Sequence, residues 1–520
     1  MNRRLRERAL SAVGGFAAIV LCVTGCESGS SPSAGSAPPS ATATAGQVAA
    51  LPSSRATPSG HTPSAGGSGP AGLSPPASVP PGASATPTAT PVSLRPVRGG
   101  PTLERTGIAL RKVVGVKQYG IRLAVDPVGK TMYLLNAASG LSRVDLKKGK
   151  LIPVAGVADI VDGVPSGLAF GPDGTAYVVA NKAKGTRTTH AIVRRGTARG
   201  SGFTWTTLAT TDEYPLGNDA FDHLYNGIVL SPDGKSVFVN AGSRTDHGEV
   251  EDNGGRFPGV RELPLTSAIF RLPADAEGLV LHDSVAALRP YLYADGFRNA
   301  FSLAVAPNGQ LFGTDNGPDA DFPDELNLIK LGGQYGFPWR FGNQVNPQAL
   351  PGYDPASDAR IEPGSGAAQN NKYNNDPTFP KPPTTTFTDA LLNAGPAAGN
   401  YVDDDGSVHD AGEEGTKLSS FTPHISPLGL VFLDKGVDAA SAPGDLHAVM
   451  LSWGSSIGSL PDQGRDLDAL TLTRSGSGYT VRTDQIASDF KHPIDEVMLD
   501  GHLYVLEYGP GGAIWELTFS

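Results

Sequence analysis

The sequence predicts an all-β fold, a six-bladed β-propeller preceded by a long disordered linker. Two observations carry this prediction: an apolar hairpin theme recurs six times after about residue 100, and no long helical periodicity competes with it. In each copy, two apolar runs flank a turn of Pro, Asp, Asn or Gly, residues that tolerate the φ values of a tight reversal. Six copies over about 420 residues allow about 70 residues each, which suits one blade with its loops.

The six copies follow one another along the chain. Their apolar runs are 123–127 with 133–135, 167–170 with 177–179, 228–230 with 237–239, 303–305, 429–432, and 497–499 with 503–505. The turns include Pro172-Asp173-Gly174 and Pro232-Asp233-Gly234. Residues 341–422 break the theme, because Pro, Asn, Asp and Gly crowd there without strand signals. We expect this span to be a large loop insertion between blades, and loops of that length often shape a site.

The N-terminus has the pattern of a lipoprotein signal peptide over residues 1–25. Four arginines within residues 1–8 precede a short apolar run, and Val23-Thr24-Gly25 leads to Cys26. The run is too short to span a bilayer as a stable helix. We expect cleavage to leave Cys26 as a lipid-carrying N-terminus; ordinary secretion with Cys26 near the cut is the alternative. Both cysteines of the chain, Cys22 and Cys26, lie in this segment, so the rest of the chain has no thiol for a disulfide.

Residues 26–100 are predicted to be a disordered tether, and residues 101–520 to be the propeller. The tether is rich in Ser, Pro, Ala, Gly and Thr and lacks the large apolar residues that offset the cost of ordering a backbone. Extended at about 3.1 Å per residue, it reaches on the order of 200 Å. It is either a spacer that crosses a cell wall or an unselected low-complexity stretch. We expect the propeller to lie in the cell envelope, lipid-anchored on the outer side of the cytoplasmic membrane, or to be secreted.

The formal net charge of −10 argues against a nucleic-acid partner. Binding a phosphate backbone needs clustered cations, and the chain shows no such cluster after the signal peptide. A small-molecule ligand fits better, and in a propeller its site is expected in or over the central channel.

Two segments carry chemistry-bearing residues in a fixed order. One runs from Gly296 to Pro338 and contains Arg298-Asn299 and Gly317-Pro318. The other has Asp222-His223 shortly before a Pro-Asp-Gly hairpin. Together they resemble the soluble quinoprotein glucose and sorbosone dehydrogenases, and the span from His424 to Leu430 looks closer to the sorbosone branch.

The resemblance implies that His223 is a general base, which takes the hydroxyl proton from a sugar's anomeric carbon while hydride passes to the quinone. Imidazole suits this role because its pKa lies near 6.5, and a neighbouring carboxylate such as Asp222 would stabilise the protonated ring. The alternative is that His223 is a loop residue hydrogen-bonded to the backbone.

By the same resemblance, Arg298 and Asn299 lie at the pocket of substrate and pyrroloquinoline quinone (PQQ). A guanidinium binds a carboxylate bidentately, which suits this cofactor. Gly317 and Pro318 would offer carbonyl oxygens to a calcium ion, a hard cation that prefers oxygen ligands.

Glu325 and Tyr335 would lie at a second calcium ion or support the loop. The alternative to a metal is a solvated acidic loop. It would contain Asp315, Asp319, Asp321, Asp324 and Glu325.

The sequence departs from the family at two places. Val164 stands where the family has a glutamine that touches substrate, and the family's basic residues near the last blade are reduced to Lys491 with His492 beside it. Losing two charge-assisted contacts of about 1.5 to 3 kcal/mol each would weaken cofactor binding by several kcal/mol.

The favoured function is therefore an extracytoplasmic, PQQ- and Ca²⁺-dependent oxidoreductase that oxidises an aldose or related sugar and passes electrons to an external acceptor. The main alternative is a degenerate, non-catalytic, lipid-anchored propeller that binds a sugar or a cell-wall ligand. A six-bladed lactone hydrolase with a channel metal is a third hypothesis.

Overall fold

The computed structural model describes residues 99–218, 222–361, 373–434, 436, 442–455 and 460–519. The predicted signal peptide, Cys26 and the tether up to residue 98 lie outside the described residues. Within the described part, no helix is long and apolar enough to cross a bilayer.

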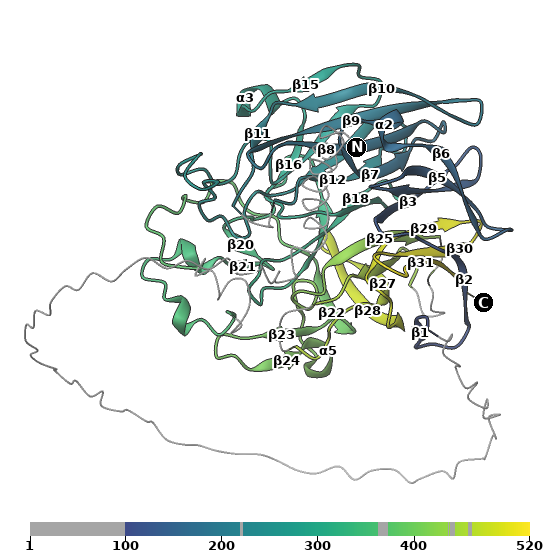
Figure 1. Cartoon of the computed structure of the whole chain (residues 1–520). Helices are drawn as coiled ribbons and strands as arrows, with labels where there is room; N and C mark the ends of the chain where they lie inside the picture. Colours follow the sequence, from purple (N-terminus) through teal and green to yellow (C-terminus); the bar gives the residue numbers. More distant parts are fainter. Residues whose placement is uncertain are drawn as a thin grey trace, which may run out of the picture. The chain divides into compact units, whose positions relative to one another are not determined.

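Six β-sheets follow one another along the chain as the blades of a propeller (Figure 1). The first blade contains β3 (Gly120–Asp126), β4 (Thr131–Asn136), β5 (Gly140–Asp145) and β6 (Lys150–Ala155). The second contains β7 (Val164–Phe170), β8 (Ala176–Lys184), β9 (Thr188–Arg199), β10 (Gly202–Thr211), β11 (Tyr214–Pro215) and β15 (Leu279–Leu281). The third contains β12 (Tyr225–Leu230), β13 (Ser236–Ala241), β14 (Ala268–Pro273) and β16 (Leu292–Asp295).

The remaining blades complete the circle. The fourth contains β17 (Ser302–Val305), β18 (Leu311–Asp315) and β19 (Glu325–Ile329). The fifth contains β25 (Pro427–Leu433), β26 (Leu446–Ser452), β27 (Leu467–Ser475) and β28 (Gly478–Ser488), with β1 (Thr102–Leu103) and β22 (Leu392–Pro396) both paired to β28. The sixth contains β29 (Pro493–Leu499), β30 (His502–Glu507), β31 (Ala513–Phe519) and β2 (Ile108–Gly115). Short helices, α2 (Val157–Ile160) and α3 (Val285–Leu288), lie between strands.

The first strand of every blade borders the central axis. These six strands, β3, β7, β12, β17, β25 and β29, contact one another in this order, and β29 also contacts β3. Strand pairing also closes the ring. In the sixth blade, β2 from the start of the described chain is the outer strand and pairs with β31 from the end of the described chain. Closure of this kind leaves no exposed inner edge.

The six predicted hairpins are confirmed. Each corresponds to the first two antiparallel strands of a blade, from β3 with β4 to β29 with β30. The turn glycines Gly174, Gly234 and Gly309 have φ of +82°, +69° and +83°, a region that side chains other than glycine rarely adopt. Apolar side chains between neighbouring blades form the core, and burying one such Leu, Ile or Val contributes about 1.5–3 kcal/mol.

The prediction that residues 341–422 lack strands was wrong in part. Besides β22, this span and its borders contain the small ladders β20 (Arg340–Phe341) with β21 (Gln344–Val345), and β23 (Asn400–Val402) with β24 (Val408–Asp410). It also contains η1 (Pro347–Ala349), η2 (Pro355–Ser357) and α5 (Ala411–Glu414). Strands of two to five residues are too short to show an alternating pattern in the sequence.

Candidate active site

The predicted site residues from two distant segments meet at the end of the channel where the inner strands begin. The backbone N–H of His223 donates to the carbonyl of Ser243 (2.9 Å), and the N–H of Ser243 donates to the carbonyl of Arg298 (2.8 Å). His223 therefore lies shortly before β12 begins, beside the loop that leads into β17. Both His223 and Arg298 are buried, with 2% of each residue exposed.

The hydrogen bonds around His223 assign its tautomer. Its Nδ1 lies 3.1 Å from Ser243 Oγ, and that hydroxyl donates its own proton to the carbonyl of Thr245 (2.7 Å). Because the Ser243 proton is used there, Ser243 Oγ accepts from Nδ1–H of His223. The lone pair of the neutral ring then lies on Nε2, the nitrogen that can accept a proton.

The carboxylate of Asp222 accepts hydrogen bonds from the backbone N–H of Gly217 at 2.8 and 3.0 Å. Burial raises the pKa of Asp222 to about 7, against the lowering effects of Arg244 and of this hydrogen bond. Asp222 therefore holds residue 217 in place next to the His223 segment.

Arg298 is fixed by a carboxylate that the sequence analysis did not identify. Its Nη2 lies 2.6 Å from Asp246 Oδ1, and its Nε donates to the Asp246 carbonyl at 2.9 Å. The other Asp246 oxygen lies 2.8 Å from Nδ1 of His247, whose ring stacks on Tyr373 with centroids 3.8 Å apart. Burial raises the pKa of Asp246, but Arg298 and His247 outweigh it and lower that pKa to about 2. The positive charge of Arg298 is thus neutralised within the protein.

Asn299 belongs to a chain of side-chain amides that links three blades. Asn240 donates to Asn226 (2.8 Å), Asn226 to Asn299 (2.8 Å), Asn299 to Asn316 (2.9 Å), and Asn316 to the carbonyl of Pro427 (3.5 Å). This series of hydrogen bonds fixes the orientation of each amide, because each side-chain oxygen accepts from one neighbour while the NH₂ group donates to the next. The sequence analysis singled out only Asn299 for a role, and the others are isolated asparagines at strand ends.

The acidic loop after β18 is buried, so the alternative of a solvated loop was wrong. Its carboxylates accept hydrogen bonds from the main chain: Asp315 from the N–H groups of Arg298 and Asn299, and Asp324 from those of Gly317 (2.6 Å) and Ser426 (2.8 Å). No set of three or more His, Cys, Asp and Glu side chains in the described chain is arranged to hold a metal ion. The buried acidic residues of this loop are Asp315, Asp319, Asp321, Asp324 and Glu325.

A small cavity brings several predicted residues together. Its volume is about 10 Å³, close to that of one water-sized probe, and Arg298, Gly317, Glu325 and Tyr335 are in its lining together with Asp315. Burial raises the pKa of Asp315 to about 7; burial and then the charge of Asp315 raise the pKa of Glu325 to about 8. Two buried carboxylates that repel each other are stabilised by a cation between them.

The surroundings of Gly317 also suit a hard cation. A Cβ at this position would lie 2.9 Å from the Phe322 carbonyl oxygen, 3.2 Å from that of Pro323 and 3.3 Å from Asp324 Oδ1. The loop is therefore packed with oxygen atoms around a residue that tolerates no side chain. The donor set fits calcium, which takes carbonyl and carboxylate oxygens.

Two predicted residues occupy supporting or peripheral positions. The Tyr335 hydroxyl donates to the Leu328 carbonyl (2.7 Å) and accepts from the Lys330 N–H (2.8 Å), so it braces the turn after β19. The Lys491 N–H donates to Glu507 Oε1 (2.9 Å), and its side chain is exposed just before β29. Of the two predicted cofactor cations, Lys491 is the one with an exposed side chain.

A third buried histidine, His424, lies near the acidic loop. His424 Nε2 lies 2.6 Å from Asp321 Oδ1. Burial lowers the pKa of His424, but the hydrogen bond and the charges of Asp321, Asp319 and Asp324 outweigh it, so the pKa is raised. Asp321 and His424 lie 103 residues apart in sequence, so no local pattern joins them.

The structure is a six-bladed propeller with a buried polar cluster at one end of its channel. Residues 122–360 match the glucose/sorbosone dehydrogenase family. This confirms the resemblance seen in the sequence. A curated relative, quinoprotein glucose dehydrogenase B of Acinetobacter calcoaceticus, is 27% identical over 240 residues, which are 40% of this chain and 48% of the relative. The aligned region therefore spans about half the length of that protein.

Solved structures of similar fold come from several organisms. They include a putative oxidoreductase (glucose dehydrogenase) of Thermus thermophilus (21% identity, 79% of this chain and 100% of that chain, TM-score 0.47). The PQQ domain of pyranose dehydrogenase from Coprinopsis cinerea is 14% identical over 83% of this chain and 99% of that chain (TM-score 0.49). The soluble aldose sugar dehydrogenase of Escherichia coli is 14% identical over 79% of this chain and 100% of that chain (TM-score 0.47).

Proposed function

We propose that this protein is an extracytoplasmic oxidoreductase that uses PQQ and Ca²⁺ to oxidise an aldose or a related sugar. The family of residues 122–360 and the relative named a quinoprotein support the sugar and the cofactor. The observation that carries the proposal is the grouping of His223, Arg298, Asn299 and Gly317, drawn from two segments, at one end of the channel.

The proposed base is Nε2 of His223. Ser243 and Thr245 hold the Nδ1 proton in place, so the ring meets the substrate hydroxyl with its lone pair. When bound, PQQ supplies the two-electron acceptor for the sugar's hydride. Asn299, oriented by Asn226 and Asn316, donates a hydrogen bond nearby.

The proposed calcium ligands are the carbonyls of Gly317 and Pro318. Glu325 adds carboxylate oxygen close by, and Tyr335 braces the loop. Lys491 would face a carboxylate of the cofactor.

A second candidate function is favoured by one observation. Because Asp246 neutralises Arg298, the site offers less positive charge to a cofactor with several carboxylates than the sequence predicted. A propeller that binds a sugar or cell-wall ligand without redox catalysis is consistent with this pair. Under either function, the pattern at residues 1–26 supports a lipid anchor on Cys26 outside the cytoplasmic membrane.

The test is dye reduction by the purified chain with PQQ, Ca²⁺ and a panel of aldoses. We expect turnover that His223→Ala lowers by about 10²–10⁴-fold, the usual contribution of a general base. His282→Ala is the matched control, because His282 is exposed and pairs with Asp212 away from this site. Sugar binding without calorimetric binding of PQQ at micromolar concentration would instead support the second candidate.

A further inference from the structure

The insertion forms a pocket of its own next to the acidic loop. Its volume is about 430 Å³, which lies in the range of small-molecule sites. Most of the lining comes from residues 344–360, and the side chains of Phe322 and Asp404 complete it. Phe322 belongs to the acidic loop, and Asp404 to the turn between β23 and β24. We call this cavity the insertion pocket.

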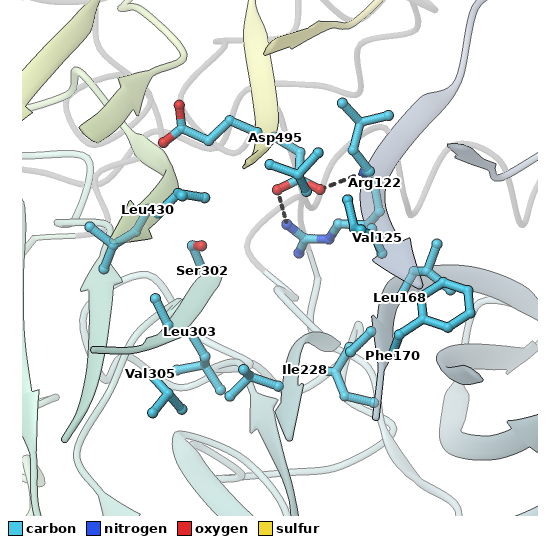
Figure 2. Close-up of a pocket in the computed structure, with 18 of the residues that line it drawn as sticks. Arg122, Val125, Leu168, Phe170, Ile228, Ser302, Leu303, Val305, Leu430 and Asp495 are labelled. Carbon is cyan, nitrogen blue, oxygen red and sulfur yellow. Dashed lines mark hydrogen bonds and ion pairs between the residues drawn. The ribbon is translucent and has the colours of Figure 1, made fainter. Parts of the chain in front are cut away.

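The central channel also contains a cavity, of about 370 Å³, but its ion pair holds blades together. Figure 2 shows Arg122 and Asp495 joined on one side of this cavity. Arg122 also donates to the carbonyls of Ser166 (3.1 Å) and Phe301 (3.0 Å). Asp495 accepts from the Leu123 N–H (2.7 Å). These contacts join the first, second and sixth blades and the start of the fourth, so this pair serves the closure of the ring.

In the insertion pocket, a guanidinium held between two carboxylates forms the polar side. Arg360 pairs with Asp404 through Nη2, and its Nη1 lies 3.6 Å from Asp358 Oδ1. The Tyr353 hydroxyl donates to Asp358 Oδ2 (2.8 Å). The guanidinium carbon of Arg360 also lies 5.4 Å from the centre of the Phe322 ring. Arg360 is therefore fixed in place, and its N–H donors lie directly beside carboxylate acceptors.

Apolar side chains lie exposed in the lining of the same pocket. Val345 is 54% exposed and Leu350 is 51% exposed, and both are among the large apolar residues of the described chain that remain in contact with solvent. Tyr353 adds a half-buried aromatic ring. Exposed apolar surface beside a few fixed polar groups is typical of a small-molecule site.

This combination favours a neutral ring that carries several hydroxyls. A hydroxyl both donates and accepts, so two neighbouring hydroxyls can donate to Asp404 and accept from Arg360 at the same time. The C–H face of a pyranose ring is apolar and can lie against Val345 and Leu350. A polyanion is disfavoured because the carboxylates of the lining outnumber its single guanidinium.

The acidic loop borders both this pocket and the candidate active site. The Phe322 carbonyl oxygen would lie 2.9 Å from a Cβ at Gly317, whereas the Phe322 side chain lines the insertion pocket. The Asp321 N–H donates to the Arg360 carbonyl (2.9 Å), which ties the insertion to the loop. The pocket and the residues proposed to hold calcium are therefore separated by one loop.

We propose that the insertion pocket binds one pyranose unit of a saccharide. Hydroxyls of this unit bridge Arg360 and Asp404, and its C–H face lies on Val345 and Leu350. The unit is either the neighbour of the sugar that enters the candidate active site or part of a separate glycan. Binding in this pocket needs neither PQQ nor Ca²⁺, so it does not depend on the proposed oxidation.

The test follows the methyl signals of Leu350 in ¹³C-methyl NMR of the intact purified chain, because they report on this pocket. Their loss in Leu350→Met assigns them. One probe is methyl β-glucopyranoside, and the matched probe is 2-(hydroxymethyl)tetrahydropyran, which has the same ring without the neighbouring hydroxyls. From the shift of these signals we expect the glycoside to bind about tenfold more tightly, as one hydrogen bond to a charged group provides.

Variants of two exposed carboxylates test the contacts. Asp404→Ala should weaken binding of the glycoside about tenfold, because the acceptor beside Arg360 is lost. Asp389→Ala is the matched control, because it also breaks an exposed carboxylate–arginine pair of the insertion, with Arg340, but does not line the pocket. His223→Ala should likewise leave the binding measured at Leu350 unchanged.

Kinetics of dye reduction distinguish the two sources of the saccharide. If the unit belongs to the substrate, Asp404→Ala raises KM for cellobiose about tenfold and leaves kcat and the KM for glucose unchanged. If it belongs to a separate glycan, both KM values stay unchanged while binding is weakened. The proposal is overturned if the Leu350 signals do not respond to the glycoside, if the two probes bind equally, if Asp404→Ala and Asp389→Ala bind alike, or if benzylammonium binds more tightly than the glycoside.

Discussion

At the scale of single residues, the site is governed by buried charges that are held by specific partners. Asp246 shows this most clearly, because one carboxylate contacts Arg298, His247 and the N–H of Asp319. A partner removed from such a group leaves the other charge buried and unpaired, which costs far more than the net contribution of the pair. Two predictions belong to this scale.

We expect Asp246→Leu to lower the free energy of unfolding by about 3–5 kcal/mol, because Arg298 remains buried without its counter-charge. Denaturant unfolding measures this. The double variant Asp246→Leu with Arg298→Met should recover much of the loss. Glu213→Ala, which breaks the exposed Lys184–Glu213 pair, serves as the control and should change stability by less than about 1 kcal/mol. Equal losses of stability in Asp246→Leu and Glu213→Ala would show that the buried Asp246–Arg298 pair matters no more than an exposed pair.

His424 should make stability depend on pH in a defined direction. Its pKa is raised in the folded protein, so its favourable interaction with Asp321 is complete below the unfolded pKa near 6.5 and is lost as the pH rises through the folded pKa. The difference in unfolding free energy between the natural chain and His424→Gln should therefore be larger at pH 5.5 than at pH 8.5. A difference that stays constant or grows with pH would contradict this assignment.

At the scale of elements, the inner hairpins differ from the closing strand and the insertion in what places them. The inner hairpins follow from local sequence patterns. By contrast, β2 pairs with β31, which lies at the other end of the described chain in sequence. Similarly, β22 joins the fifth blade in parallel to β28, although it comes from the insertion. Such contacts are long-range, and their loss affects the fold as a whole.

Removal of β2 tests the closure. A chain that begins at Val116 should unfold at a temperature lower by more than about 10 °C, or should aggregate through the exposed edge of β31. A chain that begins at Gly99 keeps β2 and is the matched control. Adding a peptide of residues 104–116 to the shorter chain should restore much of the melting temperature. Identical melting of the two chains would show that β2 does not close the ring.

At the scale of the whole molecule, a cation that binds only the folded chain would stabilise every blade together. Ca²⁺ at about 100 times its dissociation constant should raise the unfolding free energy by about 2.7 kcal/mol. Glu325→Gln should remove much of this gain, whereas Asp403→Asn, on the exposed β23–β24 turn, should keep it.

The calcium effect should also grow with pH. Asp315 and Glu325 have pKa values of about 7 and 8 in the cation-free protein, and each must lose its proton to bind the ion. Differential scanning calorimetry with Ca²⁺ or a chelator at pH 6 and pH 8.5 measures this. A calcium effect that is absent, or greater at pH 6, would contradict the site.

The signature block from Gly296 to Pro338 shows how far local patterns reach. Arg298, Gly317, Glu325 and Tyr335 are close in sequence, and the β17–β18–β19 meander folds them around one small cavity. Asp246, which holds Arg298, lies 52 residues away in another loop and follows no motif. The sequence therefore predicted most of the candidate residues but not the partner that neutralises one of them.

The sequence by itself determined the six hairpins, the family of the central segment and the candidates His223 and Arg298, because strands, turns and contiguous motifs depend on neighbouring residues. Only the tertiary structure decided that Asp246 neutralises Arg298 and that Ser243 sets the His223 tautomer. Charge balance and hydrogen bonding inside a protein depend on which distant loops are in contact. In this protein, the closure of the ring of blades brings those loops together.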